Sequence, residues 1–474
     1  MQNETALLYN VLDAACTLEI WEAQEELLKD PKWRLPYDLT MSLYKPLTHF
    51  MNRGIQVNLE ALQETKKEVE QKITEVQNKL DEIAGYHLNP NSSKACQDYF
   101  YKQKGLKPYL NKGRPTTDDL AMARLARQGF REASLIQEIR GLLKLKGTYL
   151  EMLFDEDNRV RCSYNIRGTL TGRLSSSQTI FGTGGNFQNI PPQMKKFLVA
   201  DPGMIMVEAD KARAEWVVVA YAANDPAMLK VIEEDLDPHA STASLMFSAP
   251  FDLILEEDAL IGHTTDPLEI EEKRKKLPAL KQLSFLPRTM SLRQSGKRCN
   301  HSLNYGLGFR NFALRNEIAE IEAKRIIASY EKAYPNVPLW RQGIEHQIRS
   351  TKSLSNCYGR TIRFYSEISP ELYRQAYAFI PQSTVSDMLN LGIAALYENE
   401  EKNPLISSMD MLAQVHDSLL YQVPEESLKT PEQEAEHKKL IDRYLSPPAQ
   451  YNQKIFKIKT DFKKGLTWGS LKSF

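Results

Sequence analysis

The sequence predicts a multi-domain protein of the α+β class. Its 474 residues exceed what one compact core usually organises, and about 150 residues per domain suggests roughly three modules. Long stretches repeat apolar residues at helical spacing, whereas two short apolar segments, "GMIMVEAD" and "MDMLAQV", read as strands that lead to acidic residues. Helices should therefore dominate, around a small sheet that holds carboxylates at its edge.

The overall charge of the chain does not indicate what kind of partner it binds. The chain has 61 basic and 61 acidic residues, so binding to a polyanion would require a basic cleft balanced by acidic outer faces. No run of about 18 apolar residues occurs, so no membrane span is expected. Five scattered cysteines without metal-type spacing, and an N-terminus without signal-peptide features, favour reduced thiols in a cytoplasm.

The N-terminal third reads as helices. Residues 5 to 30 form one helical pattern, which "PKWRLP" should end as a linker. Two further patterns between 41 and 84 are split at Gly54, with Asn58 as the N-cap of the second. Ser92 or Ser93 should cap the next helix, and Thr117 or its neighbour the one after. A helical module with basic edges therefore spans about residues 38 to 155.

After Asp157 the pattern changes. "NRVRCSYN" alternates like a strand, and a long loop rich in Gly, Ser, Thr and Asn follows it to about residue 192. A strand ending at Asp210 and a helix, "ARAEWVVVAYAAND", come next. Residues 250 to 290 look like a surface insertion, in which "EEKRKK" is most simply a solvated helix face. Residues 296 to 316, 321 to 350 and 370 to 398 read as helices, followed by a hairpin with His416 and Asp417 at its tip.

Asp210 and Asp417 are the first candidates for chemistry. Each follows an apolar strand, which can hold a carboxylate rigidly at a sheet edge. Mg²⁺ prefers one or two carboxylates together with substrate phosphates, and two such ions can activate a hydroxyl and stabilise a leaving oxygen. An isolated Asp is more often a cap or turn residue, so the pair needs independent support.

That support comes from "GKRCNHSLNYGLGF", residues 296 to 309. Lys297, His301 and Tyr305 are four residues apart and should share one helix face, with Phe309 towards its edge. A cation with a proton donor can hold a triphosphate, and flat rings can stack on a base. An amphipathic helix with one solvated edge is the ordinary alternative, but an ordinary core face would not mix polar and aromatic groups along one stripe.

Six segments together resemble the polymerase motifs of the family A DNA polymerases. They are "TLTGRLSSS", "NFQNIPP", "VEADKARAEW", "KRCNHSLNYGLGF", "FIPQSTVSD" and "QVHDSLL", and they occur in the family's order and approximate spacing. The similarity extends over almost the whole chain and is greatest to phage or bacterial members. Each motif alone is weak, but six in order are strong.

The resemblance implies a right-hand polymerase fold, with an antiparallel palm sheet and helical fingers and thumb. Residues 38–160 then correspond to the thumb, 161–225 and 366–474 to the two parts of the palm, and 226–365 to the fingers with the insertion near 250–290. Residues 1–37 correspond to a remnant of the 3′–5′ exonuclease domain and a linker. The implied partners are primer-template DNA and deoxynucleoside triphosphates.

The resemblance also implies roles for individual residues. Asp210, Asp417 and the Lys211 carbonyl match ligands of two Mg²⁺ ions, which promote attack of the primer 3′-hydroxyl on the nucleotide α-phosphate. Glu215 matches the residue that excludes a ribose 2′-hydroxyl. The expected nucleotide-binding residues are Lys297, Arg298, His301, Tyr305, Glu215 and Phe309, with Lys297 and His301 also catalytic. The expected contacts to primer-template are Arg173, Gln188, Asn189, Arg374, Gln382 and His416.

Several positions depart from the family pattern. Lys297 stands where arginine is usual and His301 where lysine is usual; imidazole can protonate pyrophosphate but is a weaker permanent cation. Phe309 replaces a tyrosine whose hydroxyl helps to hold the glutamate, so Glu215 is expected to be held less firmly. Ser418 replaces a glutamate, which leaves one carboxylate fewer near the metal ions, and Ala378 replaces an asparagine.

The N-terminus suggests what the chain does not do. "YNVLDAA" resembles the last exonuclease motif, with Tyr9 and Asp13 at its tyrosine and aspartate, but the earlier motifs are missing. One aspartate cannot hold two metal ions, so proofreading is expected only if a separate exonuclease or replisome partner supplies it. Two alternatives stay open, a single-subunit RNA polymerase-like enzyme, which Glu215 disfavours, and a non-catalytic DNA-binding homologue, which the two aspartates disfavour.

Overall fold

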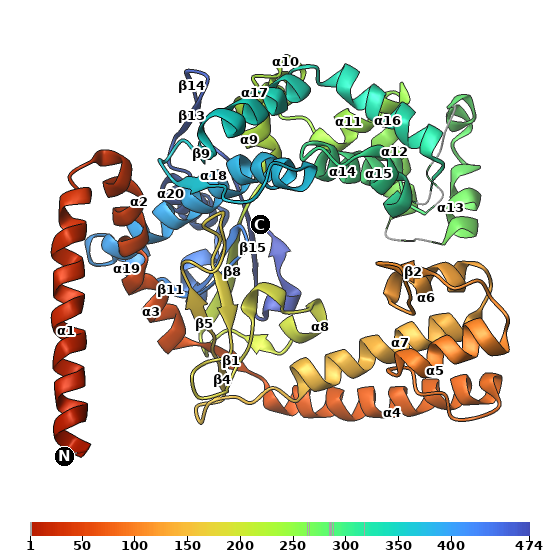
Figure 1. Cartoon of the computed structure of the whole chain (residues 1–474), viewed down its shortest axis with the longest axis horizontal. Coiled ribbons are helices and arrows are strands. Elements are labelled where there is room, and N and C mark those ends of the chain that lie inside the picture. The colour runs from red at the N-terminus through yellow and green to blue at the C-terminus, as the bar shows by residue number, and fades with distance from the viewer. Residues whose placement is uncertain (1, 263, 265, 284–286, 288, 317) are drawn as a thin grey trace.

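A five-stranded antiparallel sheet forms the centre of the molecule (Figure 1). This computed structural model describes residues 2–474 except 263, 265, 284–286, 288 and 317. The strand order is β11 (Asp410–Val415), β12 (Ser418–Pro424), β8 (Met204–Lys211), β15 (Thr460–Gly465) and β16 (Lys472–Ser473). The mixed helix and sheet composition confirms the predicted fold class, and β8, β11 and β12 are the predicted strands.

The two faces of this sheet have different environments, because successive side chains of a strand point to opposite faces. Val207 and Ala209 of β8 belong to a core that also includes Leu389 of α18 (Pro370–Glu398) and Ile441 of α20 (Pro431–Leu445). On the other face of β8 lie Met206, Glu208 and Asp210. The long helices therefore support the sheet from behind and leave its acidic face directed away from them.

An elongated helical arm, residues 59–150, extends from one side of the sheet (Figure 1). Its elements are α4 (Leu59–Ala84), α5 (Ser93–Gln97), η1 (Asp98–Gln103), β2 (Leu110–Asn111), β3 (Arg114–Pro115), α6 (Asp119–Arg127), α7 (Arg131–Leu145) and η2 (Lys146–Leu150). Asn58, Ser92 and Asp118 cap α4, α5 and α6 through their side chains, as predicted. Residues 102 to 131, at the far end, contain eight Lys or Arg and only two Asp or Glu before Glu132.

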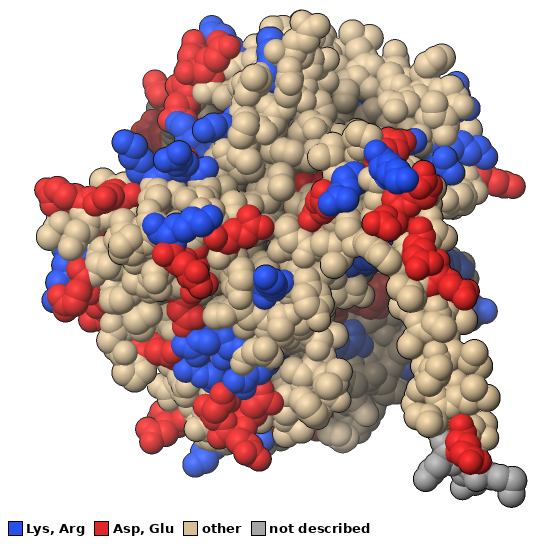
Figure 2. All heavy atoms as spheres, turned by 90° about the vertical axis from the view of Figure 1, so that its left-hand side faces the viewer, with Lys and Arg blue, Asp and Glu red and all other residues tan. Residues whose placement is uncertain are grey.

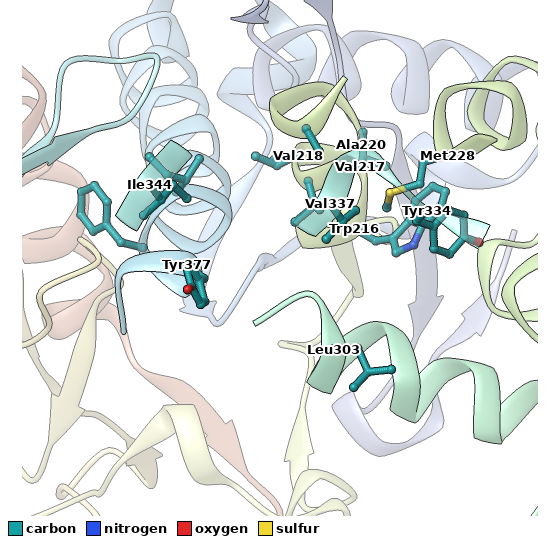
Figure 3. Close-up of a cluster of buried hydrophobic side chains, with 14 of the residues drawn as sticks. Trp216, Val217, Val218, Ala220, Met228, Leu303, Tyr334, Val337, Ile344 and Tyr377 are labelled. Atoms are coloured by element: carbon teal, nitrogen blue, oxygen red, sulfur yellow. The ribbon is translucent and has the colours of Figure 1, made fainter. Parts of the chain in front are cut away.

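A helical lobe, residues 214–351, lies above the sheet in Figure 1. It contains α9 (Ala214–Ala223), α10 (Pro226–Glu233), α11 (Pro238–Phe247), α12 (Phe251–Ile261), α13 (Pro267–Arg274), η4 (Pro278–Gln282), α14 (Leu292–Leu303), α15 (Phe309–Asn316), α16 (Glu320–Ala333) and α17 (Asn336–Thr351). Its core gathers Trp216 and Val217 of α9, Leu303 of α14 and Val337 of α17 (Figure 3). Tyr377 of α18 belongs to the same core, so the lobe packs against the helix that also supports the sheet.

The N-terminal helices differ from the sequence prediction. α1 (Gln2–Leu27) is a single exposed helix that stands off from the body (Figures 1 and 2) and leaves Leu7, Tyr9 and Leu18 more than half exposed. "PKWRLP" is not a linker but the start of α2 (Pro31–Ser42), with Asp30 as its N-cap. Proline is favourable in the first helical turn, where its missing N–H has no intrahelical partner. α3 (Tyr44–Arg53) follows and packs against the sheet through Leu47 and Phe50.

Short elements complete the fold. They are α8 (Pro192–Lys195), α19 (Pro404–Ser407), η3 (Phe187–Asn189), η5 (Glu400–Lys402), η6 (Glu425–Leu428), η7 (Trp468–Ser470) and the strands β1 (Ile55–Val57), β4 (Arg159–Val160), β5 (Ser163–Asn165), β6 (Ser175–Ser177), β7 (Leu198–Val199), β9 (Ser353–Ser355), β10 (Thr361–Arg363), β13 (Ala449–Tyr451) and β14 (Lys454–Phe456). Strand β1 joins β4 and β7 in a small sheet at the base of the arm. In the described part of the chain, no helix is both long and apolar enough to span a bilayer. All five cysteines are free thiols.

Candidate active site

The structure brings Asp210 and Asp417 together at one edge of the central sheet. Strands β8 and β12 pair so that Asp210 lies opposite Ser418, the residue after Asp417. The Lys211 amide donates a hydrogen bond of 3.1 Å to the Asp417 carbonyl, which fixes the tip of the β11–β12 hairpin against the end of β8. Two residues separated by 207 positions therefore meet, as the sequence predicted.

The carboxyl groups of Asp210 and Asp417 lie near each other in a largely buried site, and both have raised pKa values. Burial, and then the charge of Asp417, raise the pKa of Asp210 to about 7, and burial also raises the pKa of Asp417. Both causes disfavour the ionised carboxylates while no cation is near. A divalent cation would remove this penalty, so the donor set is chemically suited to hard oxygen-binding ions such as Mg²⁺.

Lys211 can offer this site only its backbone. Its side chain points to the opposite face of the sheet, where the ammonium donates to Ser446 Oγ at 2.6 Å and to Thr460 Oγ1 at 2.9 Å. Burial lowers the pKa of Lys211 to about 8. Among the described residues there is no group of three or more His, Cys, Asp or Glu side chains placed to hold a metal. The candidate ligands are therefore two carboxylates and a carbonyl, a set that leaves most coordination positions to substrate and water.

Asp461 is a third acidic residue on this edge that the sequence reasoning missed. Strand β15 pairs with β8 so that Asp461 lies opposite Asp210, on the side away from Ser418. Residues opposite each other in an antiparallel pair share a face, and the charge of Asp461 contributes to the raised pKa of Asp210. Only the strand register reveals this neighbour, because nothing in the segment "IKTDFKK" distinguishes it from an ordinary surface strand.

Glu215 is held by two donors from different parts of the chain. The Arg173 guanidinium donates to Glu215 Oε1, and the Tyr305 hydroxyl donates to Glu215 Oε2. Burial and the charge of Glu215 raise the pKa of Tyr305 well above its usual value, so the phenol keeps its proton. The expectation that Phe309 leaves Glu215 without a phenolic partner is wrong, because Tyr305 supplies the hydroxyl from four residues earlier.

The predicted stripe of residues 297 to 309 is interrupted. Helix α14 ends at Leu303, so Lys297 and His301 share its exposed face, whereas Tyr305 lies beyond its end and Phe309 begins α15. The break follows from Gly306, whose φ of +69° is left-handed and whose missing Cβ makes room for the Tyr377 ring. Helical spacing alone could not reveal this bend, which turns Tyr305 towards Glu215.

His239 of α11 is a further site residue that the sequence reasoning missed. Its ring centroid lies 6.0 Å from that of His301, and Asn300 Nδ2 lies 3.1 Å from His239 Nδ1. Burial lowers the pKa of His239 to about 4, and the nearby charges of Lys297 and His301 act in the same direction. The α14 face therefore combines exposed Lys297, Arg298 and His301 with a neutral imidazole, a set suited to an anion.

Gln188 joins the glycine-rich loop to the acidic hairpin. Its side-chain carbonyl accepts a 2.7 Å hydrogen bond from the His416 amide, and its amide nitrogen donates to the Gln414 carbonyl at 3.1 Å. The neighbouring Asn189 carbonyl accepts from the Tyr149 hydroxyl at 2.8 Å, which ties the loop to the arm. His416, at the hairpin tip, is exposed with a left-handed φ of +54°. Gln188, Asn189 and His416 thus form one connected surface beside Asp417.

Helix α18 carries the remaining predicted residues. Gln382 is the single residue between 379 and 390 that is not fully buried, and Arg374 is partly exposed one turn into the helix, paired with Glu371. The adjoining loop is held on α18 by Ser386, whose hydroxyl donates to the Gly172 carbonyl at 2.8 Å. This anchor lies next to Arg173 and so positions its guanidinium.

A hollow of about 1120 Å³ runs between the arm and the loop that carries Asn189. Its walls are residues of α7 and η2 on one side, among them Lys144 and Tyr149, and Ser176, Asn186 and Asn189 on the other. Most of the lining residues are polar or small, but Leu142, Leu145 and Met152 also face the hollow. Such a mixed surface has room for a ligand that is larger than a metabolite.

Comparison with known proteins agrees with this geometry. The model of DNA polymerase family A matches residues 59–258 and 280–470. The chain is 25% identical over 425 residues to the thermostable DNA polymerase I of Thermus aquaticus, covering 85% of this chain and 45% of that protein. It is 26% identical over 494 residues to DNA polymerase I of Borreliella burgdorferi, covering 99% and 48% respectively. The chain therefore spans about half the length of these relatives.

A solved structure shows the same fold. The polymerase domain of Pol1 from M. smegmatis, in complex with DNA primer-template and dNTP, superposes with a TM-score of 0.75 at 21% identity, covering 91% of this chain and 70% of that one. The matched family model covers most of the chain, including both aspartates and α14. The chain belongs to DNA polymerase family A.

Proposed function

We propose that the chain is a template-directed DNA polymerase, which adds deoxynucleotides to a primer 3′-hydroxyl with release of pyrophosphate. The observation that carries this proposal is the register that sets Asp210 beside the Asp417 hairpin, on the sheet face away from α18 and α20. Asp210, Asp417 and the Lys211 carbonyl would hold two Mg²⁺ ions. When bound, such ions lower the pKa of the attacking hydroxyl and stabilise charge on the leaving oxygen.

The exposed face of α14 is proposed to bind the nucleotide triphosphate. Lys297 and Arg298 neutralise its charge, and the His301 imidazole is the proton donor to the departing pyrophosphate. Tyr305 borders the sugar and base, and Phe309 supports the turn behind it. Glu215 occupies the space of a ribose 2′-hydroxyl and is kept there by Arg173 and Tyr305.

The primer-template is proposed to lie along the hollow between the arm and the loop that carries Asn189. Residues 38–160 then act as the thumb, residues 226–365 as the fingers, and residues 161–225 with 366–474 as the palm. Arg173, Gln188, Asn189, Arg374, Gln382 and His416 would contact the DNA near the nascent pair. Donors such as Gln188 and Gln382 can sense minor-groove acceptors, which correct base pairs have in common. The basic tip of the arm would neutralise backbone phosphates.

A primer-extension assay tests this proposal. Wild-type protein with Mg²⁺, a primer-template and four deoxynucleotides should extend the primer, and Asp210→Ala should abolish extension while binding of the same DNA persists. Extension by the alanine variant would reject the assigned site. Absence of extension by wild type with retained DNA binding would favour the non-catalytic alternative, and a preference for ribonucleotides would favour an RNA polymerase-like enzyme.

We also propose that residues 1–474 do not proofread by themselves. Asp13 lies on the exposed helix α1 and is the one carboxylate of the exonuclease-like motif "YNVLDAA", whereas two-metal hydrolysis needs several. A primer with a mismatched 3′ end should therefore not be shortened in the presence of Mg²⁺. Shortening that survives Asp13→Asn would contradict the assignment of this segment.

A further inference from the structure

We infer that the helices α12 (Phe251–Ile261) and α13 (Pro267–Arg274), here called the insertion, form a brace that sets the orientation of α14, with Glu257 and Arg293 as positioning residues. This inference rests on the proposed function, because it concerns the helix that would carry the nucleotide-binding groups. Figure 1 shows α12 beside α14 and α13 at the outer edge of the lobe. The sequence suggested only a solvated surface insertion here.

Glu257 is the centre of the brace. Its side chain is completely buried, and its Oε1 accepts from Arg274 Nε at 2.8 Å. Its other oxygen, Oε2, accepts from the Leu292 backbone amide at 2.7 Å. That amide is at the first position of α14 and has no partner within the helix. A buried carboxylate from α12 therefore caps α14 and is neutralised by Arg274 of α13.

Arg274 shows why the insertion was misjudged from sequence. It belongs to "EEKRKK", whose Glu271, Glu272 and Lys275 are exposed as expected, yet its own side chain is only 9% exposed. Besides Glu257, it donates to the Met290 carbonyl at 2.9 Å, which holds the segment just before α14. One residue of the charged run thus faces inwards and fastens the start of α14 from two sides.

Residues 291 to 293, at the start of α14, are each held by contacts to neighbouring elements. Ser291, the N-cap, donates to Asp258 Oδ1, and the Leu292 side chain is fully buried in the core of the insertion. The Arg293 guanidinium donates to Asp237 Oδ2 at 2.8 Å and lies 3.5 Å from Asp258. Arg293 therefore links α14 to both α11 and α12, so these helices behave as one body.

Geometry explains why this anchoring matters for a nucleotide. At 1.5 Å per residue, His301 lies about 13 Å along the axis from Leu292, so a tilt of roughly 10° at the anchor moves it by about 2 Å. Displacements of about 1 Å can cost roughly 100-fold in rate. Gly296 fixes the roll of the helix, because a Cβ there would lie 2.2 Å from the His239 carbonyl oxygen. The brace therefore presets where Lys297 and His301 stand.

Two pairs of variants test the brace by single-turnover incorporation of one templated dNTP. Glu257→Leu with Arg274→Met replaces the buried pair by apolar side chains, a change that is often neutral for stability but deprives the Leu292 amide of its acceptor. The matched control, Glu272→Gln with Lys275→Met, removes an exposed pair at the end of α13 in the same insertion. The first should raise the apparent Kd for dNTP about tenfold and slow incorporation. The control should change neither, and affinity for primer-template should stay constant in both.

Variants of Arg293 provide a second test in case the double variant folds poorly. It is partly exposed, so Arg293→Gln should fold, raise the apparent Kd for dNTP several-fold and speed hydrogen exchange of amides at the start of α14, whereas Arg293→Lys should restore both. Unchanged dNTP affinity and exchange in Arg293→Gln would overturn the inference, as would equal losses in the control pair. If wild type incorporates no nucleotide, the proposed function fails instead, and the exchange measurement still decides whether the brace exists.

Discussion

Replacing Tyr305 by Phe isolates one hydroxyl of the candidate site. In the structure this hydroxyl donates to Glu215 Oε2 while Arg173 donates to Oε1, so the substitution removes one of two donors and leaves the ring in place. With Arg173 alone, the carboxylate can turn towards the guanidinium and away from the sugar position. We therefore expect Tyr305→Phe to admit ribonucleotides more readily.

The magnitude follows from the kind of hydrogen bond. A hydrogen bond to a charged group contributes about 1.5–3 kcal/mol, and about 1.4 kcal/mol corresponds to a factor of ten. Because Arg173 still holds the carboxylate, the lower end applies, and discrimination between dNTP and rNTP should fall by about tenfold. The assay is the ratio of incorporation efficiencies for the two sugars on one primer-template.

One further variant makes this result interpretable. Tyr330→Phe removes a hydroxyl from the same lobe, one that donates to Asn304 rather than to Glu215, and should leave the ratio unchanged. A ratio that stays within about twofold of wild type in Tyr305→Phe would refute the view that this hydroxyl holds the sugar-excluding carboxylate.

Other expectations concern charge at and behind the site. His301→Ala should slow single-turnover incorporation by about 100-fold or more, with His301→Lys largely retaining it, since proton transfer contributes roughly that much; an unchanged alanine variant rejects the role. The pKa of Asp210, raised to about 7, means that the metal-free folded chain loses stability as pH rises from about 4 to about 7. In thermal scans of chelator-treated protein, Asp210→Asn should therefore have a higher melting temperature than wild type at pH 8. Near pH 4 the two melting temperatures should be equal. Arg360→Met leaves the fully buried Asp387 carboxylate without its cation and should destabilise folding by about 3–5 kcal/mol in urea titration, whereas Arg363→Met, in an exposed residue nearby, should not.

Features that depend on neighbouring residues in the chain were predictable. Asn58 and Ser92 cap helices through backbone amides three residues away, so the sequence contains both partners of each hydrogen bond. The two apolar runs of "MDMLAQVHDSLLYQV", separated by the polar pair His416 and Asp417, similarly predict a hairpin with Asp417 at its turn. "PKWRLP" was misread because proline ends a helix at one position and begins it at another.

Features that join distant segments were decided by the tertiary structure. The amino-acid sequence by itself established the strand ends, the caps and the order of the family motifs, because these follow from local periodicity and side-chain chemistry. It could not establish that Tyr305 reaches Glu215, that Asp461 lies opposite Asp210, or that Glu257 caps α14. Those contacts depend on strand register, on the bend at Gly306 and on burial, which are properties of the packed chain as a whole.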